Sequence, residues 1–298
     1  MNIITHVMTG VTIATPLAVQ RPLTAAAIVF GSLLPDLDVL SRCWGKKAFL
    51  RFHQTLTHSL PCIAVMTLAM TGAWHWMGWP ELWAPAALGA GMMIHSLMDF
   101  ANTYGTTIMW PFVRRRVALN WMFFTDAVTV AVTTTLGTAC IYSALHEGFS
   151  ALPAVIFAIF IAGWWTLRAV LARRARELAI TPGDSLVPGS WWHFYGCHVD
   201  AGGLAELYLI NAINGTRRTR GRCLTMDEQY APLLASVPEY VMMRSLSSEY
   251  HVVEAQPCSE GLKLICRDLR TQNFGGRFGQ LTVTLDRMGN VQRKVFDV

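Results

Sequence analysis

Long apolar stretches separated by short polar breaks dominate the chain up to residue 172. They cover about residues 3–19, 22–38, 56–78, 82–101, 119–145 and 152–172. A helix that crosses a bilayer needs about 20 apolar residues, and the first, second and fourth stretches are shorter or more interrupted than that. The pattern predicts about six helical segments in a membrane, at least one of them tilted, half-buried or re-entrant.

Beyond residue 181 polar and apolar residues alternate, which predicts half-buried strands. Strands are expected at about 191–199, 203–211, 250–255, 262–269, 279–286 and 291–298. Met226–Leu246 is expected to be helical, Met288–Asn290 to form a hairpin turn, and Pro182, Gly183 and Asp184 to mark a linker. The predicted fold is an all-α polytopic membrane domain over 1–178, followed by a small β-rich α+β domain over 185–298.

Composition and charge support a membrane protein. Hydrophobic residues make up 53% of the 298 residues and charged residues 14%, against about 25% charged in ordinary soluble proteins. The net charge of +5 comes from short basic clusters beside apolar runs, which indicates the positive-inside rule and not nucleic-acid binding. One set of loops holds ten basic residues and the other only Arg21; the ten are Arg42, Lys46, Lys47, Arg51, Arg114, Arg115, Arg116, Arg173, Arg174 and Arg176. Both termini and the β-rich domain are therefore expected in the cytoplasm.

Several ionisable residues fall near the same, cytoplasmic ends of the predicted helices. They are His6, Asp36, Asp38, His53, His58, His95, Asp99 and Asp126, with Asp126 expected about two turns into its helix. Ionisable groups at membrane depth persist when they pair with one another or serve function. His95 and Asp99 have i, i+4 spacing, so both side chains lie on one helix face and can bind one ion.

This combination predicts a metal site. Imidazole and carboxylate ligands without thiolate suit zinc, manganese or iron at catalytic centres. Such ions activate water for hydrolysis, and a pair of ions can clamp the two reacting oxygens of a phosphoester. More candidate ligands are present than one tetrahedral ion uses, so one or two ions are expected.

The order of the motifs resembles a known family. "THVMTG", "GSLLPDLD", "HQTLTHS", "HSLMDFANTYGT" and "TDAVT" are similar to the motif series of the bacterial membrane-bound metal-dependent hydrolases, the YdjM-like family, over about residues 1–172. That family is distantly similar to zinc-dependent phospholipase C and the S1/P1 nucleases. The resemblance implies a bacterial inner-membrane enzyme.

The resemblance also implies roles for individual residues. Metal-ligand roles fall on His6, Asp36, His58, His95 and Asp99, and Asp38 and His53 become further ligands or acid/base groups. The phospholipases supply more histidines after the corresponding helix, whereas the next candidate here is Asp126. A three-zinc cluster is therefore not expected.

Residues beyond the "HSLMD" helix are candidates for substrate binding. Asn102, Tyr104 and Thr106 either bind a substrate phosphate, orient metal-bound histidines, or form a polar loop that ends at Gly105. Arg114 and Arg115, with Arg116 beside them, either attract anionic lipid headgroups or only set topology. Both functions of the arginines are compatible.

The expected function is hydrolysis of phosphoester bonds in membrane lipid or lipid-linked substrates at the cytoplasmic headgroup level. The alternatives are an ion- or proton-coupled transporter, or a non-enzymatic membrane regulator with a structural metal whose C-terminal domain binds a protein partner. The polar residues stay on one side of the predicted bundle, which argues against a path across the bilayer. The sequence does not specify substrate or oligomeric state.

Overall fold

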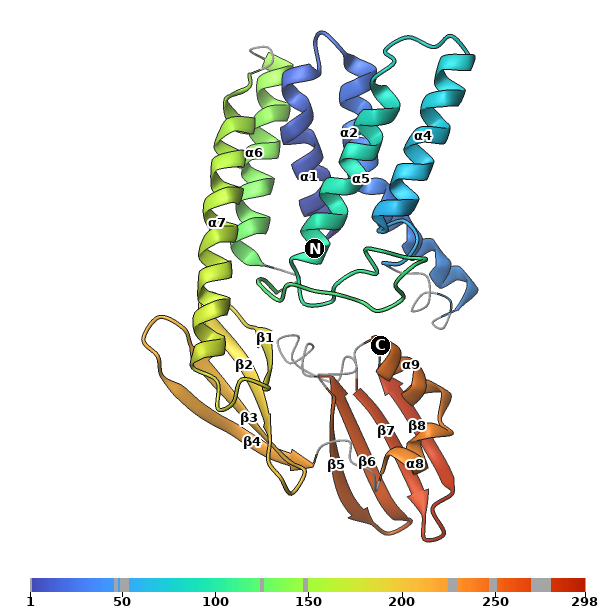
Figure 1. Ribbon diagram of the computed structural model, residues 1–298, viewed down its shortest axis with the longest axis vertical. Coiled ribbons are helices and arrows are strands. Elements are labelled where there is room, and N and C mark those ends of the chain that lie inside the picture. The colour runs from blue at the N-terminus through green and yellow to red at the C-terminus, as the bar shows by residue number, and fades with distance from the viewer. Residues whose placement is uncertain are drawn as a thin grey trace. The chain divides into compact units, whose positions relative to one another are not determined.

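A computed structural model describes residues 2–45, 48, 54–123, 126–146, 150–224, 230–246, 251–268 and 280–297. The chain divides into two compact units, Met1–Arg168 and Ala169–Val298. The first is helical and the second is built on antiparallel strands, as predicted (Figure 1).

The first unit is a bundle of helices. Its elements are α1 (Ile3–Ala14), η1 (Thr15–Leu17), α2 (Pro22–Leu33), η2 (Leu34–Trp44), α4 (Leu60–Trp76), α5 (Ala84–Phe100), α6 (Ala127–His146) and α7 (Leu152–Glu177), the last of which runs on into the second unit. Asn2 and Ser59 cap the N-termini of α1 and α4 by accepting hydrogen bonds from Thr5 N and Cys62 N. Pro22 opens α2, where its missing N–H costs no hydrogen bond.

Two boundaries differ from the sequence-based expectation. The second apolar stretch changes at Leu34 from α-helix to 3₁₀-helix, because Pro35 cannot donate to the α-helical ladder. The helix expected from residue 119 begins only at Ala127. Residues 101–123 instead form a loop held by bridges between Asn102 and Met122 and between Thr106 and Val117.

At Gly31 and Gly91 the backbones of helices α2 and α5 are in direct contact. A Cβ at Gly31 would lie 2.2 Å from Leu88 O, and one at Gly91 would lie 2.4 Å from Ile28 O. Small residues of this kind let membrane helices approach closely. The approach places the segment after α2 beside the C-terminal half of α5.

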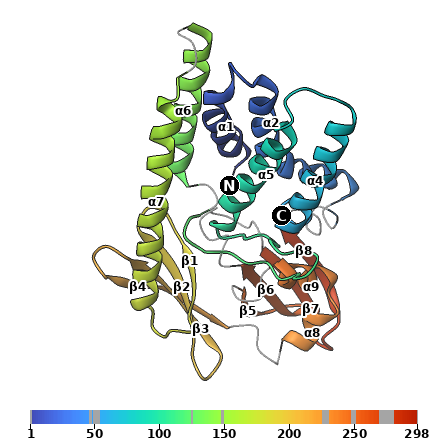
Figure 2. The same ribbon diagram turned by 45° about the horizontal axis from the view of Figure 1, so that its top comes forward.

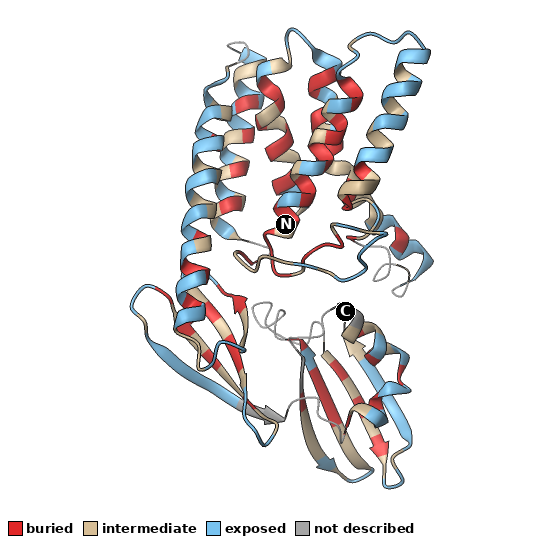
Figure 3. Ribbon diagram, in the orientation of Figure 1, coloured by how far each residue is buried: buried red, intermediate tan, exposed pale blue. Residues whose placement is uncertain are grey.

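Among the described residues, three helices are long and apolar enough to cross a membrane: Pro22–Trp44, Ala127–His146 and Leu152–Glu177. Helices α4 and α5 have 17 residues each, at the short end of the range for a span. Buried residues gather on α1, α2 and α5, whereas α4 and α7 are mostly exposed (Figure 3). Large apolar side chains on the exposed faces, such as Val65, Leu68 and Ile159, suit contact with lipid.

The second unit begins with a four-stranded antiparallel meander. Its strands are β1 (Ser185–Pro188), β2 (His193–Val199), β3 (Leu204–Asn211) and β4 (Arg217–Leu224), in that order across the sheet. Strand β4 was not predicted, because its sequence "RRTRGRCL" lacks apolar alternation; charged residues are typical of edge strands.

The predicted linker is fixed in place by the carboxylate of Asp184. It accepts hydrogen bonds from Thr181 Oγ1 (2.6 Å), Tyr208 Oη (2.5 Å) and His198 Nδ1 (2.8 Å). Burial would raise the pKa of this carboxyl, but these hydrogen bonds outweigh burial and lower the pKa below its usual value. The segment that enters β1 is therefore held against β2 and β3.

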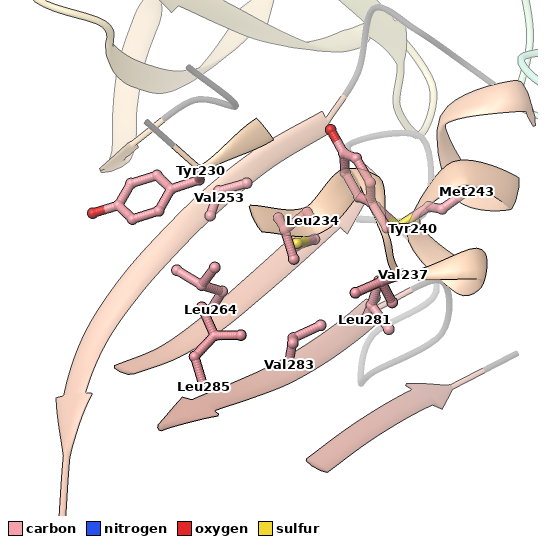
Figure 4. Close-up of a cluster of buried hydrophobic side chains, with 11 residues drawn as sticks. Tyr230, Leu234, Val237, Tyr240, Met243, Val253, Leu264, Leu281, Val283 and Leu285 are labelled. Atoms are coloured by element: carbon pink, nitrogen blue, oxygen red, sulfur yellow. The ribbon is translucent and has the colours of Figure 1, made fainter. Parts of the chain in front are cut away.

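A second antiparallel meander follows. It consists of β5 (His251–Cys258), β6 (Gly261–Asp268), β7 (Gln280–Asp286) and β8 (Val291–Asp297), and α8 (Ala231–Ala235) and α9 (Pro238–Leu246) precede it in the chain. Side chains from both helices pack on the sheet: Leu234 of α8 and Met243 of α9 join Leu264, Leu281 and Val283 in a buried core (Figure 4). This half of the unit has the α+β character that the sequence predicted.

Candidate metal centre

The candidate ligands lie on four separate segments. His6 belongs to α1, Asp36 to η2, His58 to the turn before α4, and His95 and Asp99 to α5. The ends of the helices that bring these residues together lie at one end of the bundle (Figures 1 and 2). Helix packing, and not local sequence, assembles the centre.

Four of these residues can hold a metal ion. One ligand atom from each of Asp36, His58, His95 and Asp99 lies within 4.8 Å of the other three. His58, His95 and Asp99 are buried, and the Asp36 side chain retains 13% exposure. Among the described residues, this is the group of histidine and acidic side chains that lie close enough together to hold a metal ion.

The distances within the group fit the spacing of ligands around one ion. His58 Nε2 lies 3.1 Å from His95 Nε2 and 3.4 Å from Asp99 Oδ2. His95 Nε2 lies 3.5 Å from Asp36 Oδ1 and 3.7 Å from Asp99 Oδ2. Ligands 2.0–2.1 Å from a tetrahedral zinc ion are about 3.3 Å apart. The donor set and its spacing therefore fit a divalent metal.

The hydrogen bonds of His95 fix its ring for metal binding. His95 Nδ1 lies 2.7 Å from Ser32 O, which can only accept, so Nδ1 carries the proton. In the neutral ring Nε2 then has a free lone pair, directed at the other ligands. Ser32 is in the last turn of α2, where carbonyl groups lack a helical partner.

Asp38 lies next to the ring nitrogen of His58 that faces away from the other ligands. Thr57 Oγ1 lies 3.2 Å and Asp38 Oδ2 3.6 Å from His58 Nδ1, while Nε2 faces the other ligands. A carboxylate behind a metal-binding histidine orients the ring and raises its basicity. Asp38 thus occupies the position of an orienting group, and it is not one of the four clustered ligands.

His6 lies next to the four ligands. Its ring stacks on His95 with centroids 3.6 Å apart, and its Nε2 lies 3.3 Å from Asp99 Oδ1. Both ring nitrogens are buried, and neither has a hydrogen-bond partner in the part of the chain that the structure describes. A buried imidazole of this kind is available as a fifth donor, although its ligand atom does not join the four-residue group.

Two further sequence-based candidates are not part of the centre as described. His53 lies outside the described residues. Asp126 directly precedes α6, which begins at Ala127. Its Oδ2 accepts hydrogen bonds from Thr129 N (2.9 Å) and Trp164 Nε1 (3.0 Å). Such a bond to the third following N–H is the pattern of an N-terminal helix cap. The prediction that Asp126 lies two turns inside a helix was wrong.

Of the candidate substrate residues in the loop after α5, one contacts the centre, two make contacts within the loop and two are exposed. Asn102 reaches the centre, with its Nδ2 donating to Asp99 Oδ1 at 3.1 Å. Tyr104 N donates to Asn102 Oδ1, and Thr106 is buried in the bridge with Val117. Arg114 and Arg115 are exposed on the loop surface.

Sequence reasoning missed Gln54 and Ser32 as parts of the site, and it considered Arg116 only as one of the basic residues that attract headgroups. Gln54 is buried and its Nε2 donates to Asp99 Oδ2, and Arg116 donates in turn to Gln54 Oε1. Gln54 stands inside the quoted motif "HQTLTHS", but a glutamine next to a histidine carries no specific chemical signal. Ser32 acts through its carbonyl group, which any residue would supply.

The fold and this centre define a helical membrane protein with a buried candidate metal site. The chain belongs to the YdjM inner membrane protein family, whose family model matches residues 1–173. The match confirms the predicted family and, with the three apolar helices, indicates an inner membrane protein. The relationship to zinc-dependent phospholipases and nucleases stays a prediction.

A curated relative is uncharacterized protein YfhP of Bacillus subtilis (strain 168). It is 25% identical over 187 residues, which cover 58% of this chain and 55% of the relative. The chain therefore matches about half the length of that protein. No solved structure matches the chain significantly.

Proposed function

We propose that the protein is a metal-dependent hydrolase that cleaves phosphoester bonds of lipid or lipid-linked substrates at the level of the headgroups. The observation that carries the proposal is the group of Asp36, His58, His95 and Asp99 at one end of an apolar helix bundle. A divalent ion held by these residues would supply Lewis acidity and an activated water. Zinc suits the donor set best, and manganese or iron would also fit.

The number of donors favours more than one closed tetrahedral ion. His6 adds a fifth side chain beside the four ligands, and Asp99 directs one oxygen to His6 and the other to His58 and His95. Five donors exceed the need of one closed tetrahedral ion. We propose either two ions that share Asp99, or one ion of higher coordination number with a position for substrate.

The substrate side of the centre is assigned to the loop after α5. Arg114 and Arg115 are exposed and directly follow Phe112 and Val113, which are 79% and 46% exposed. Exposed apolar residues beside basic ones suit the interface of an anionic membrane, where each basic residue contributes about 1 kcal/mol of attraction. His53 is proposed as the acid/base group.

The test uses purified full-length protein in lipid vesicles that contain anionic phospholipid. We expect stoichiometric metal by elemental analysis, and release of a phosphate-containing product that stops on chelation and resumes with zinc. His53→Ala should keep its metal and lose rate, whereas His146→Ala, an exposed histidine at the end of α6, should change neither. Full metal content with no cleavage of any phospholipid or lipid-linked phosphate would contradict hydrolysis.

The proposed sidedness makes a topological prediction. Because the loops with ten basic residues should face the cytoplasm, a reporter fused after Ala172 is expected to be cytoplasmic, and one inserted near Ser150 to be external. Alkaline phosphatase and fluorescent-protein fusions measure this directly. The reversed pattern would place the metal centre on the other side of the membrane.

A further inference from the structure

Gln54 connects the candidate metal centre to the basic loop. Its side-chain Nε2 donates to Asp99 Oδ2 at 3.1 Å, and its Oε1 accepts from Arg116 Nη1 at 2.9 Å. The residue is 7% exposed. A charged side chain of the loop is thus one amide away from a candidate metal ligand.

Chemistry fixes the direction of this amide. A guanidinium group only donates hydrogen bonds, so the atom of Gln54 that faces Arg116 must be the oxygen. The NH₂ group must then face Asp99, which as a carboxylate only accepts. Arg116 and Asp99 thus enforce the same orientation, and without Arg116 the amide would be held from one side only.

Asn102 holds the other oxygen of Asp99 in the same way. Its Nδ2 donates to Asp99 Oδ1 at 3.1 Å, while its Oδ1 accepts from Tyr104 N (2.8 Å) and Gly105 N (3.2 Å). Both amides are therefore locked as donors to one carboxylate. Neutral donors orient a carboxylate without cancelling the charge that attracts a metal ion, whereas an arginine in direct contact would compete with the ion.

The backbone of Gln54 also makes hydrogen bonds next to the centre. Its φ is +58°, an uncommon value for a residue other than glycine. In this conformation Gln54 N donates to Asp38 Oδ2 at 2.8 Å, and Gln54 O accepts from Thr107 N at 3.3 Å. Asp38 is the carboxylate next to His58 Nδ1, so Gln54 contacts one candidate ligand, Asp99, and the group that orients another, His58.

We propose that Gln54 is a positioning residue of the metal centre, and that Arg116 acts on the centre through it. Gln54 holds Asp99 in the orientation that binds metal, and Arg116 holds Gln54 as a donor. The inference rests on the metal centre of the proposed function and not on hydrolysis. It can therefore be tested without a substrate.

The test measures zinc affinity of full-length protein in detergent by competition with a chromophoric chelator. Gln54→Met keeps the length of the side chain and removes the amide, and it should weaken zinc binding about 10–100-fold. The visible spectrum of the Co²⁺-loaded variant should also change, because Asp99 then keeps only the amide of Asn102 to orient it. Arg116→Met should cause a smaller loss of affinity.

The double variant separates a relay from two independent effects. If Arg116 acts through Gln54, the variant with both changes should bind zinc no more weakly than Gln54→Met alone. Gln20→Met, an exposed glutamine in the turn between η1 and α2, is the matched control and should bind like the unaltered protein. Losses that multiply in the double variant would overturn the relay.

The outcomes distinguish this inference from the proposed function. Unaltered zinc affinity and an unaltered Co²⁺ spectrum in Gln54→Met would overturn the positioning role while leaving the metal centre intact. Should Gln54→Met fail to fold, unchanged affinity and spectrum in Arg116→Met would overturn the role of Arg116 on its own. An unaltered protein that binds no metal would overturn the metal centre itself.

Discussion

Replacing His95 with alanine is expected to abolish stoichiometric metal binding. His95 Nε2 lies within 3.7 Å of a ligand atom from each of Asp36, His58 and Asp99, so this imidazole contacts all three of the other ligands. Its removal leaves two neighbouring carboxylates with one imidazole fewer to balance them. The metal content measured by elemental analysis should fall from about one or two ions per chain to near zero. Hydrolysis should disappear with the metal.

The same measurement on other variants tests the set of ligands. His58→Ala and Asp99→Ala should lose metal as His95→Ala does, because each removes one member of a group that closes around the ion. His75→Ala is the control, since His75 is an exposed histidine in the last turn of α4. Full metal content in all the ligand variants, with a change only in folding yield, would show that the histidines are structural polar pairs.

A substitution that touches no ligand is expected to have nearly as large an effect. In Gly91→Ala the new Cβ would lie 2.4 Å from Ile28 O and 2.9 Å from Ser32 N. These are backbone atoms that no rotamer change can move, so α2 must shift away from α5. Ser32 O is the partner of His95 Nδ1, and Asp36 follows on the same segment.

The expected size follows from the cost of overpacking. Forcing an extra methyl group into a tight contact costs about 1–3 kcal/mol, which weakens metal binding by about 5–150-fold if the metal-binding arrangement bears the strain. Gly72→Ala in α4 is the matched control, because its Cβ would meet nothing within 4 Å. Titration with zinc measures both variants, and equal affinities would show that α2 and α5 yield without moving the ligands.

Parts of the fold could be predicted because the responsible signal is local. Apolar runs marked the helical half, and the i, i+4 spacing of His95 and Asp99 placed two candidate ligands on one face of α5. Alternation marked six strands of the second unit, but not β1 or β4. Strand β4 has arginine where apolar residues were sought, so only its neighbour β3 identifies it as a strand.

The missed parts of the site depend on long-range packing. Gln54 contacts Asp99 and Arg116, which are 45 and 62 residues away in the chain, so no local pattern relates them. Asp126 was placed inside a helix because the apolar run around it continues in both directions. The hydrogen bond to Thr129 N marks instead where that helix begins.

The distribution of the ligands along the chain bears on how the protein is made. Asp36 and His58 precede α5, and His95 is synthesised about 60 residues after Asp36, which takes about 3–12 s at typical translation rates. During that interval the early carboxylates have no partner on α5, and they are joined to it only after α5 packs against α2. An ion held by all four residues of the group could therefore bind only after α5 has been made and has packed against α2.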